Sequence, residues 1–474
     1  MISKAEILET AGKVGLRPDV VEKDYALGWT LAGISAHEDL RETWIFKGGT
    51  CLKKCYFETY RFSEDLDFTL MDEAHLNQEF LKRVFGEIAD WIYERSGLEI
   101  PAEGQSFDLF NNPRGNISCQ GKLSYKGPVS PNVALIRLPR IKLDLTADER
   151  IVLPAVRTPV FHSYSDAQEA SFEVLSYSYV ETFGEKVRAL AERTRPRDLY
   201  DVVNLFRNAE ARPRAAELLD VLRQKCDFKG IAVPKLEDLA SHRDALEGSW
   251  AAMLAHQLPA LPPVDDFWSV LPEFFAWLTG GEMPVELPVF ALAAGETVIH
   301  GRTFSLDIPN TSQTYLEIIR FAGGNRLCVD LDYQGTTRRI EPYSLRRTSE
   351  GNIVLHAFNL NKNEHRSYRV DRITGARATT QTFGPRYAVE LTPSGPITIP
   401  HSRNGGSFGD MALNRPRLAP ARSRAFGHPT YVYQCPVCQK KFRRQTNDSS
   451  LKPHKTPQGY PCPGRTGYLA DTQY

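Results

Sequence analysis

A pair of glycines and several acidic residues lie close together near the start of the chain. Gly48 and Gly49 stand where a strand could turn into a helix, which would let the backbone approach a phosphate group closely. Asp65 and Asp67 follow in a strand-like segment and project to the same face, because side chains alternate along a strand. Asp144 sits in a second apolar–acid–apolar segment, so we expect it to add a third carboxylate from a neighbouring strand.

Three carboxylates that face one cavity suit Mg²⁺, a hard cation that completes its shell with water and substrate phosphates. Nucleotidyl transfer needs such a metal site beside a group that holds a polyphosphate. Each motif also has a simpler interpretation. A Gly-Gly pair is more often only a turn, and an Asp-x-Asp pair is commonly a solvated strand face. Their combination in this order favours a phosphate- and metal-binding site.

The elements that must position these residues can be predicted from periodicity. Apolar residues recur at three- and four-residue steps over 20–35 and 78–95, which indicates helices. The segments 66–70 and 140–146 are short strand candidates. Such alternation indicates an α/β or α+β domain.

Four motifs in the first 201 residues resemble the AbiEii/AbiGii toxin family of nucleotidyltransferases. They are Gly48-Gly49-Thr50-x-Leu52, Ser63-Glu64-Asp65-Leu66-Asp67-Phe68, Glu181-x4-Lys186, and Arg195-x2-Asp198-x2-Asp201. The resemblance implies a polymerase-β-like fold and two Mg²⁺ ions held by Asp65 and Asp67, with Asp144 as the candidate for a third ligand. It also implies that a nucleoside triphosphate (NTP) is bound by Gly48, Gly49, Thr50, Ser63 and Lys186. Lys186 and Asp198 join Asp65, Asp67 and Asp144 as candidate catalytic residues.

The last two motifs lie in helical patterns and have alternatives of their own. Lys186 can offer a point charge to the triphosphate, or it can belong to an exposed helix with Glu–Lys pairing. Asp198 and Asp201 are three residues apart on one helical face, and Asp201 could instead pair with Arg195 or Arg197.

The resemblance further implies a toxin of a toxin–antitoxin or phage-defence system, with RNA, such as tRNA, as the acceptor and a cognate antitoxin as a partner. Two alternatives remain open. One is a catalytically silent defence regulator that only binds nucleotide or nucleic acid. The other is a transferase that modifies small molecules, which would leave the rest of the chain without a purpose.

A middle segment has β-type alternation, seen in Leu327, Val329, Leu331 and Tyr333, followed by a turn at Gln334-Gly335-Thr336. Residues 338–345, 353–357 and 365–373 resemble a WYL domain, a small Sm- or SH3-like β-barrel, which implies sensing of nucleic acid or nucleotides. Guanidinium groups beside aromatic rings suit single-stranded nucleic acid. Alternatively, these arginines pair with nearby acids. The candidates are Arg338, Arg339, Arg366, Arg369 and Arg372.

The C-terminal segment contains Cys435, Cys438, His454 and Cys462, four soft or borderline ligands that suit a closed, structural Zn²⁺ site. Metal would supply folding energy that so short a segment lacks. A redox pair or a disordered thiol tail are the alternatives. Basic residues that suit contact with a phosphate backbone follow the first two cysteines: Lys440, Lys441, Arg443 and Arg444.

Charge and composition agree with this organisation. Residues 396–474 carry 12 Lys and Arg against 3 Asp and Glu, whereas the rest of the chain carries 46 against 55, so a basic end follows an acidic body. This favours a polyanionic partner, although a solvated tail is the alternative. The chain lacks an 18-residue apolar run and a secretory signal, so we expect a cytoplasmic protein without membrane contact.

We therefore expect a multidomain α+β chain. A nucleotidyltransferase-fold mixed sheet with helices comes first, a small Sm/SH3-like β-barrel second and a zinc-ribbon-like module last. The expected segments are a transferase domain at 1–245, a helical connector at 246–290, a WYL-like domain at 291–395, a linker at 396–429 and a zinc-binding module at 430–474.

Overall fold

The structure is a computed structural model of the chain, whose contacts divide it into two compact units, Met1–Pro400 and His401–Tyr474. In the first unit it describes residues 1–57, 60–129, 131, 133–166, 172–281, 286–291, 293–300 and 310–391. In the second it describes residues 430–435, 437–438, 440–444, 449–454, 456, 462–466 and 468–473. The predicted linker at 396–429 lies outside the described residues.

A mixed seven-stranded sheet forms the centre of the first unit, in the order β3-β4-β5-β2-β1-β7-β6. The β2–β5 and β1–β7 pairs are parallel, and the other pairs are antiparallel. The strands are β1 (Trp44–Lys47), β2 (Asp65–Leu70), β3 (Gln105–Asn111), β4 (Ile117–Ser124), β5 (Arg140–Thr146), β6 (Val156–Pro159) and β7 (Glu173–Ser176).

Two long helices, α2 (Pro18–Ala36) and α4 (Gln78–Ser96), contact each other and the sheet. Helix α4 begins because the Asn77 side chain accepts two backbone N–H bonds, and it ends where Gly97 adopts φ 73°. Its buried residues recur at helical spacing. Helix α2 is instead apolar on most sides and is buried along most of its length, as expected for a helix that packs against α1, α4 and the sheet. The remaining N-terminal elements are α1 (Lys4–Val14) and α3 (Gly48–Cys51), which continues as a π-helical turn (Leu52–Tyr56).

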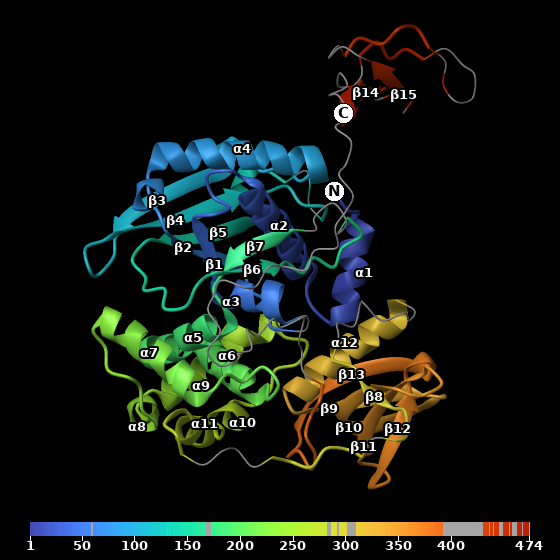
Figure 1. Cartoon of the computed structure of the whole chain (residues 1–474). Coiled ribbons are helices and arrows are strands. Elements are labelled where there is room, and N and C mark those ends of the chain that lie inside the picture. The colour runs from blue at the N-terminus through green and yellow to red at the C-terminus, as the bar shows by residue number, and fades with distance from the viewer. Residues whose placement is uncertain are drawn as a thin grey trace, which may run out of the picture. The chain divides into compact units, whose positions relative to one another are not determined.

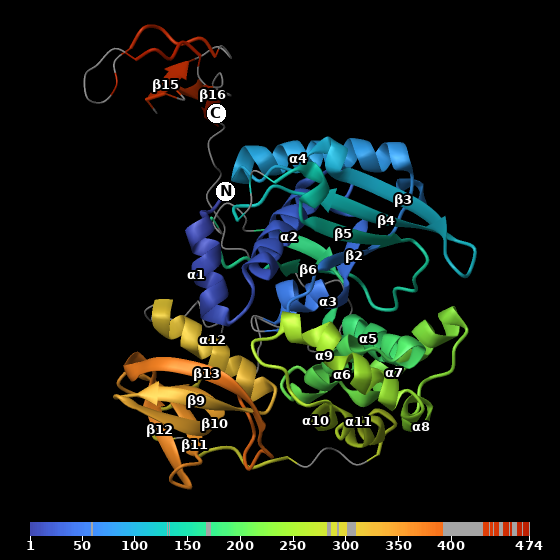
Figure 2. The ribbon, with the colours of Figure 1, turned by 180° about the vertical axis from the view of Figure 1, so that it is seen from behind.

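A group of helices lies on the opposite side of the sheet from α4 in both views (Figure 1, Figure 2). Its aromatic side chains join it to one continuous hydrophobic core, in which Phe274 of α11 contacts Phe183 of α5 and Phe206 of α6. The group comprises α5 (Tyr179–Arg193), α6 (Pro196–Arg207), α7 (Ala215–Lys229), α8 (Leu236–Ala240), α9 (Arg243–Leu254), α10 (Val264–Trp268) and α11 (Leu271–Leu278).

Helix α12 (Asn310–Gly324) precedes an antiparallel sheet in the order β12-β11-β10-β9-β13, with β8 paired to β10. The predicted turn joins β9 to β10, and Gln334 and Gly335 adopt φ values of 51° and 75° there. This open, barrel-like sheet confirms the expected β architecture. The strands are β8 (Thr297–Val298), β9 (Leu327–Tyr333), β10 (Thr336–Arg347), β11 (Ile353–Asn359), β12 (Glu364–Arg369) and β13 (Ile373–Thr382).

The second unit contains a three-stranded antiparallel sheet in the order β15-β14-β16. Its strands are β14 (Thr430–Gln434), β15 (Lys441–Arg444) and β16 (Tyr468–Gln473). A small buried cluster beside the sheet includes Cys435, Cys462 and Leu451. The mixed sheet, the antiparallel sheet and this cysteine cluster together confirm the predicted fold class. Among the helices of the described residues, none has the length and apolar character that a membrane crossing requires.

Candidate functional site

Strands β2 and β5 bring the three predicted acids together. Asp65 and Asp67 share one face of β2, and Asp67 lies opposite Asp144 in the parallel β2–β5 register. On the other side of β2, Lys47 at the end of β1 lies opposite Asp67. Asp67 therefore stands between a carboxylate and an ammonium group at the centre of the sheet.

The acids affect one another's protonation. Burial and the neighbouring Asp144 raise the pKa of Asp67 to about 6, although Lys47 and Lys186 act in the opposite direction. Burial and Asp65 likewise raise the pKa of Asp144. Carboxylates that raise each other's pKa in this way lack sufficient positive charge nearby. A divalent cation would relieve that repulsion, and oxygen ligands are those that Mg²⁺ prefers.

The glycines lie directly against the acids. Gly48 adopts φ 83°, and a Cβ atom there would stand 2.0 Å from Oδ2 of Asp67. A Cβ at Gly49 would stand 2.4 Å from Nη2 of Arg61 and 3.1 Å from Oγ of Ser63. Any larger residue at either position would displace these groups. The Thr50 hydroxyl donates to the backbone carbonyl of Asp65, which fixes the start of α3 to β2.

Asp201 of α6 is the centre of a buried ion-pair network. Arg61 donates to it through Nε and Nη2, each at 2.7 Å, and the Tyr60 hydroxyl donates at 2.9 Å. Nζ of Lys186 lies 2.7 Å from its Oδ2. The partners of Asp201 are thus Arg61 and Lys186, and not the neighbouring arginines that the helical spacing had suggested.

Asp198 lies one helical turn earlier on α6 and is fully buried. It accepts two hydrogen bonds from Arg193, from Nε at 2.7 Å and from Nη2 at 2.9 Å. The pKa of Arg193 is raised mainly by Asp198, with a smaller contribution from Asp67. Asp198 therefore positions the guanidinium group of Arg193, which interacts electrostatically with Asp67 of the acid cluster.

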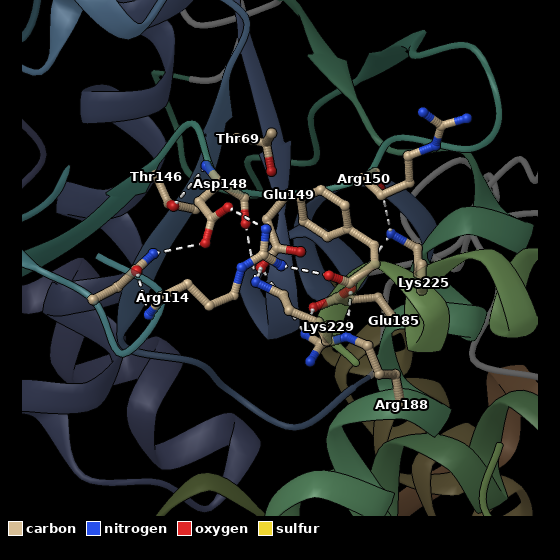
Figure 3. Close-up of polar contacts among 12 residues, drawn as sticks. Thr69, Arg114, Thr146, Asp148, Glu149, Arg150, Glu185, Arg188, Lys225 and Lys229 are labelled. Carbon is tan, nitrogen blue, oxygen red and sulfur yellow. Dashed lines mark hydrogen bonds and ion pairs between the residues drawn. The ribbon is translucent and has the colours of Figure 1, made fainter. Parts of the chain in front are cut away.

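A second charged cluster, missed at the sequence level, surrounds Glu149 in the segment after β5 (Figure 3). Lys47, Arg188 and Lys229 lie within ion-pair distance of its carboxylate. Next to it, Nζ of Lys225 lies 2.7 Å from Oε1 of Glu181. The four-residue spacing of the two lysines on α7 was a signal in the sequence. Their acidic partners could not be identified because they lie 40 to 80 residues away in the chain.

The arginines of the antiparallel sheet are mostly paired with acids. Arg339 donates to both oxygens of Asp330, at 2.8 and 3.0 Å. Arg366 pairs with Glu364, and Arg369 pairs with Asp371. Arg338 lies over the rings of Tyr333 and Tyr368. Arg372 follows β12 and faces solvent. The structure does not gather the five arginines into one unpaired group.

The four predicted zinc ligands come together in the second unit. Their ligand atoms all lie within 4.8 Å of one another, and Sγ of Cys435 is 3.7 Å from Sγ of Cys462. Two thiolates on one tetrahedral Zn²⁺ ion would be separated by about 3.8 Å, given Zn–S bonds of about 2.3 Å. Nδ1 of His454 donates to the carbonyl of Lys452, whereas its buried Nε2 has no hydrogen-bond partner among the described residues. That nitrogen is thus the atom available to a metal.

Lys440 and Lys441 are exposed at the start of β15, close to the cysteine cluster. The backbone carbonyl of Lys440 accepts the N–H of Cys435, which ties this basic segment to the first ligand. The side chains of Arg443 and Arg444 lie outside the described residues.

Comparisons with known proteins agree with these features. The family model of the AbiEii nucleotidyl transferase toxin of type IV toxin–antitoxin systems matches residues 29–278, and the WYL domain model matches residues 314–378. No curated protein matches the chain.

Two solved structures are similar to parts of the chain. The nucleotidyltransferase toxin MenT4 from Mycobacterium tuberculosis is 19% identical, with 60% of this chain and 91% of that chain covered and a TM-score of 0.39. The proteasome accessory factor B/C of Arthrobacter aurescens is 12% identical, with 51% of this chain and 28% of that chain covered and a TM-score of 0.16.

The first family model covers more than half of the 474 residues, including the acids, the glycines and the helices that carry Lys186 and Asp201. The chain belongs to the AbiEii family of nucleotidyl transferase toxins.

Proposed function

We propose that the first unit transfers a nucleotide from an NTP to a hydroxyl group of RNA in a Mg²⁺-dependent reaction. The observation that carries this proposal is the convergence of Asp65, Asp67 and Asp144 on adjacent strands, where burial and mutual repulsion raise the pKa of Asp67 to about 6. These three carboxylates would hold Mg²⁺. When bound, the metal supplies Lewis-acid chemistry at the triphosphate and at the attacking hydroxyl.

Other residues of the chain would bind the triphosphate, stabilise the developing negative charge and accept a proton. Gly48 and Gly49 lack the Cβ atoms that would displace Asp67, Arg61 and Ser63, so these side chains keep their places beside the proposed triphosphate site. Lys186, held by Asp201, and Arg193, held by Asp198, place positive charge near the acids where negative charge develops. Asp144 lies beside Asp67 on the adjacent strand, so a carboxylate oxygen of Asp144 is placed to accept the proton of the attacking hydroxyl. Pyrophosphate leaves as the new phosphodiester bond forms.

The test is incubation of the purified protein with Mg²⁺, labelled NTPs and total RNA. We expect label transfer to RNA, and we expect Asp65→Asn with Asp67→Asn to reduce it by about 10³-fold or more, as loss of an essential metal site should. Glu87→Gln on the exposed face of α4 is the matched charge-removing control. Retained nucleotide binding without any transfer by the wild-type protein would instead support a catalytically silent regulator.

We propose a nucleic-acid-sensing role for the WYL domain and recognition of the transferase by a cognate antitoxin. The half-buried guanidinium of Arg338, which lies over the rings of Tyr333 and Tyr368, supports the first. Membership in a toxin family supports the second. Co-purification with the product of a neighbouring reading frame, and loss of toxicity when both are expressed, would test the antitoxin.

We also propose that the second unit binds one structural Zn²⁺ ion through Cys435, Cys438, His454 and Cys462. The unpaired, buried Nε2 of His454 and the 3.7 Å separation of two thiols support it. Metal analysis should find about one zinc per chain. Cys435→Ser with Cys438→Ser should remove it, whereas Cys328→Ser in the antiparallel sheet should not. Retained zinc in the double variant would refute the site.

A further inference from the structure

The cluster around Glu149 has an unusual distribution of charge. A single oxygen, Oε1 of Glu149, faces Nζ of Lys229 at 3.1 Å, Nζ of Lys47 at 3.6 Å and Nη2 of Arg188 at 4.0 Å. The three cations come from α7, β1 and α5. Elements from both the sheet and the helical group therefore converge on one carboxylate oxygen.

Glu149 carries one negative charge but lies within ion-pair distance of three cations. Among the described residues, it supplies the only carboxylate within ion-pair distance of either Lys47 or Lys229. Arg188 has further partners in Glu185 and Glu192. The two ammonium groups thus share one ion-pair partner, and an anion with several oxygens could pair with both of them at once.

The cluster is continuous with the proposed metal site. Lys47 lies opposite Asp67 across the β1–β2 pair and immediately precedes Gly48. Burial lowers the pKa of its ammonium group, but Glu149, Tyr177, Glu185 and Asp67 together raise that pKa above its ordinary value. Lys47 therefore links the two sites, because it lies opposite Asp67 of the proposed metal site and within ion-pair distance of Glu149. The phosphates of a metal-bound triphosphate must lie next to those acids.

Hydrogen bonds fix the backbone around Glu149. The carbonyls of Asp148 and Arg150 accept hydrogen bonds from Lys229 and Lys225, at 2.9 and 3.1 Å. The Asp148 side chain accepts from Asn112 and Asn116 (Figure 3 shows the surrounding contacts). The side chain of Glu149 is 10% exposed, so the phosphates of a ligand would have to displace it to reach the three cations.

We propose that Lys47, Arg188 and Lys229 bind the pyrophosphate portion of the NTP, and that the Glu149 carboxylate occupies their site in the nucleotide-free protein. The inference rests on the proposed nucleotidyl transfer. Glu149 keeps the three cations from repelling one another before nucleotide binds. It also competes with the incoming phosphates, so that binding requires an anion of higher charge than a carboxylate.

The test uses inorganic pyrophosphate with Mg²⁺ as the probe, in calorimetric titrations of the full chain. Glu149→Gln removes the competing charge and should bind pyrophosphate about tenfold more tightly, since a charge-assisted contact is worth about that factor. Lys229→Gln should bind it about tenfold more weakly. Glu192→Gln, which removes a half-exposed partner of Arg188 alone, is the control and should stay within about twofold of wild type.

Two results would overturn the inference. One is a folded Glu149→Gln variant whose affinity is unchanged or weaker, which would make Glu149 a structural partner. The other is an unchanged affinity in Lys229→Gln, which remains informative if Glu149→Gln fails to fold. Label transfer to RNA separates this outcome from failure of the proposed function. Normal transfer with unchanged pyrophosphate affinities refutes only the binding of pyrophosphate by the cluster around Glu149, whereas absent transfer with the expected affinity changes refutes only the reaction.

Discussion

The buried Asp201 and the half-buried acids of β2 and β5, Asp65, Asp67 and Asp144, differ in the cations that the chain provides for them. Although burial acts against it, Arg61 and Lys186 hold the pKa of Asp201 well below its ordinary range. Burial and Asp144 raise the pKa of Asp67 to about 6. The chain thus supplies Asp201 with internal partners and leaves the β2–β5 acids with a deficit of positive charge. A carboxylate that is paired with side-chain cations stabilises the fold. A group of carboxylates with too few such partners is instead suited to bind a metal cation from solution.

The largest effect that this comparison predicts is on folding. Asp201→Asn should lower the free energy of unfolding by about 3–5 kcal/mol, because Arg61 and Lys186 would stay buried without their carboxylate. Urea unfolding followed by circular dichroism measures the change.

Asp67→Asn is the matched variant for this experiment, since it removes the same charge from a neighbouring element. It should leave stability unchanged or raise it, because the repulsion from Asp144 is relieved. Equal destabilisation by the two substitutions would erase the distinction between the two groups.

The next effect is a pH dependence of metal stabilisation. Asp67 titrates at about 6 when folded and near its ordinary 3.8 when unfolded. Between these values the folded state holds a proton that the unfolded state has lost, so stability falls as pH rises, by about 3 kcal/mol. Mg²⁺ binds the ionised acids and should raise the melting temperature more at pH 7.5 than at pH 5.

Thermal unfolding with and without Mg²⁺ at both pH values checks this sign. Burial also raises the pKa of Glu22, which contributes to the metal-free pH dependence but not to the difference that Mg²⁺ makes. Asp67→Asn should abolish most of that difference. Equal stabilisation at pH 5 and pH 7.5 would show that the metal does not bind these acids.

The smallest effect concerns ion pairs at the surface. An exposed ion pair stabilises the fold much less than a buried one, so its arginine remains available to another partner. Arg366 and Arg369 have side chains that are 51% and 37% exposed. Such pairs contribute about 1 kcal/mol or less, so a phosphate can replace the carboxylate. Arg366→Ala with Arg369→Ala should weaken binding of single-stranded RNA and reduce the salt slope of the logarithm of the affinity by about 1.4.

Glu364→Gln provides the opposite control, because it releases Arg366 and should leave RNA affinity unchanged or slightly increased. Fluorescence anisotropy at several salt concentrations measures both variants. An unaltered salt slope in the double arginine variant would assign these residues to structural pairing alone.

The acid cluster could be predicted from sequence because its parts are local. Alternation places Asp65 and Asp67 on one strand face, and an apolar–acid–apolar segment identifies β5 around Asp144. Periodicity also predicted α2, α4 and the turn at Gln334-Gly335. The four zinc-ligand candidates were found from residue type and spacing, and the structure gathers them into one cluster.

The ion-pair networks could not be predicted in the same way. Arg61 and its partner Asp201 are 140 residues apart, and Glu149 meets cations from β1, α5 and α7. Charge alone does not select among the many possible partners in the chain, because the tertiary fold decides which side chains meet. For the same reason, helical spacing suggested nearby arginines as the partners of Asp201. The sequence likewise did not indicate that Lys47 meets Glu149.

Diffraction from crystals grown with Mn²⁺ and a non-hydrolysable NTP tests the central claim most directly. Anomalous scattering from manganese should appear between the carboxylates of Asp65, Asp67 and Asp144, with the triphosphate next to it. A bound nucleotide without manganese at these carboxylates, or manganese bound only elsewhere, would contradict the account.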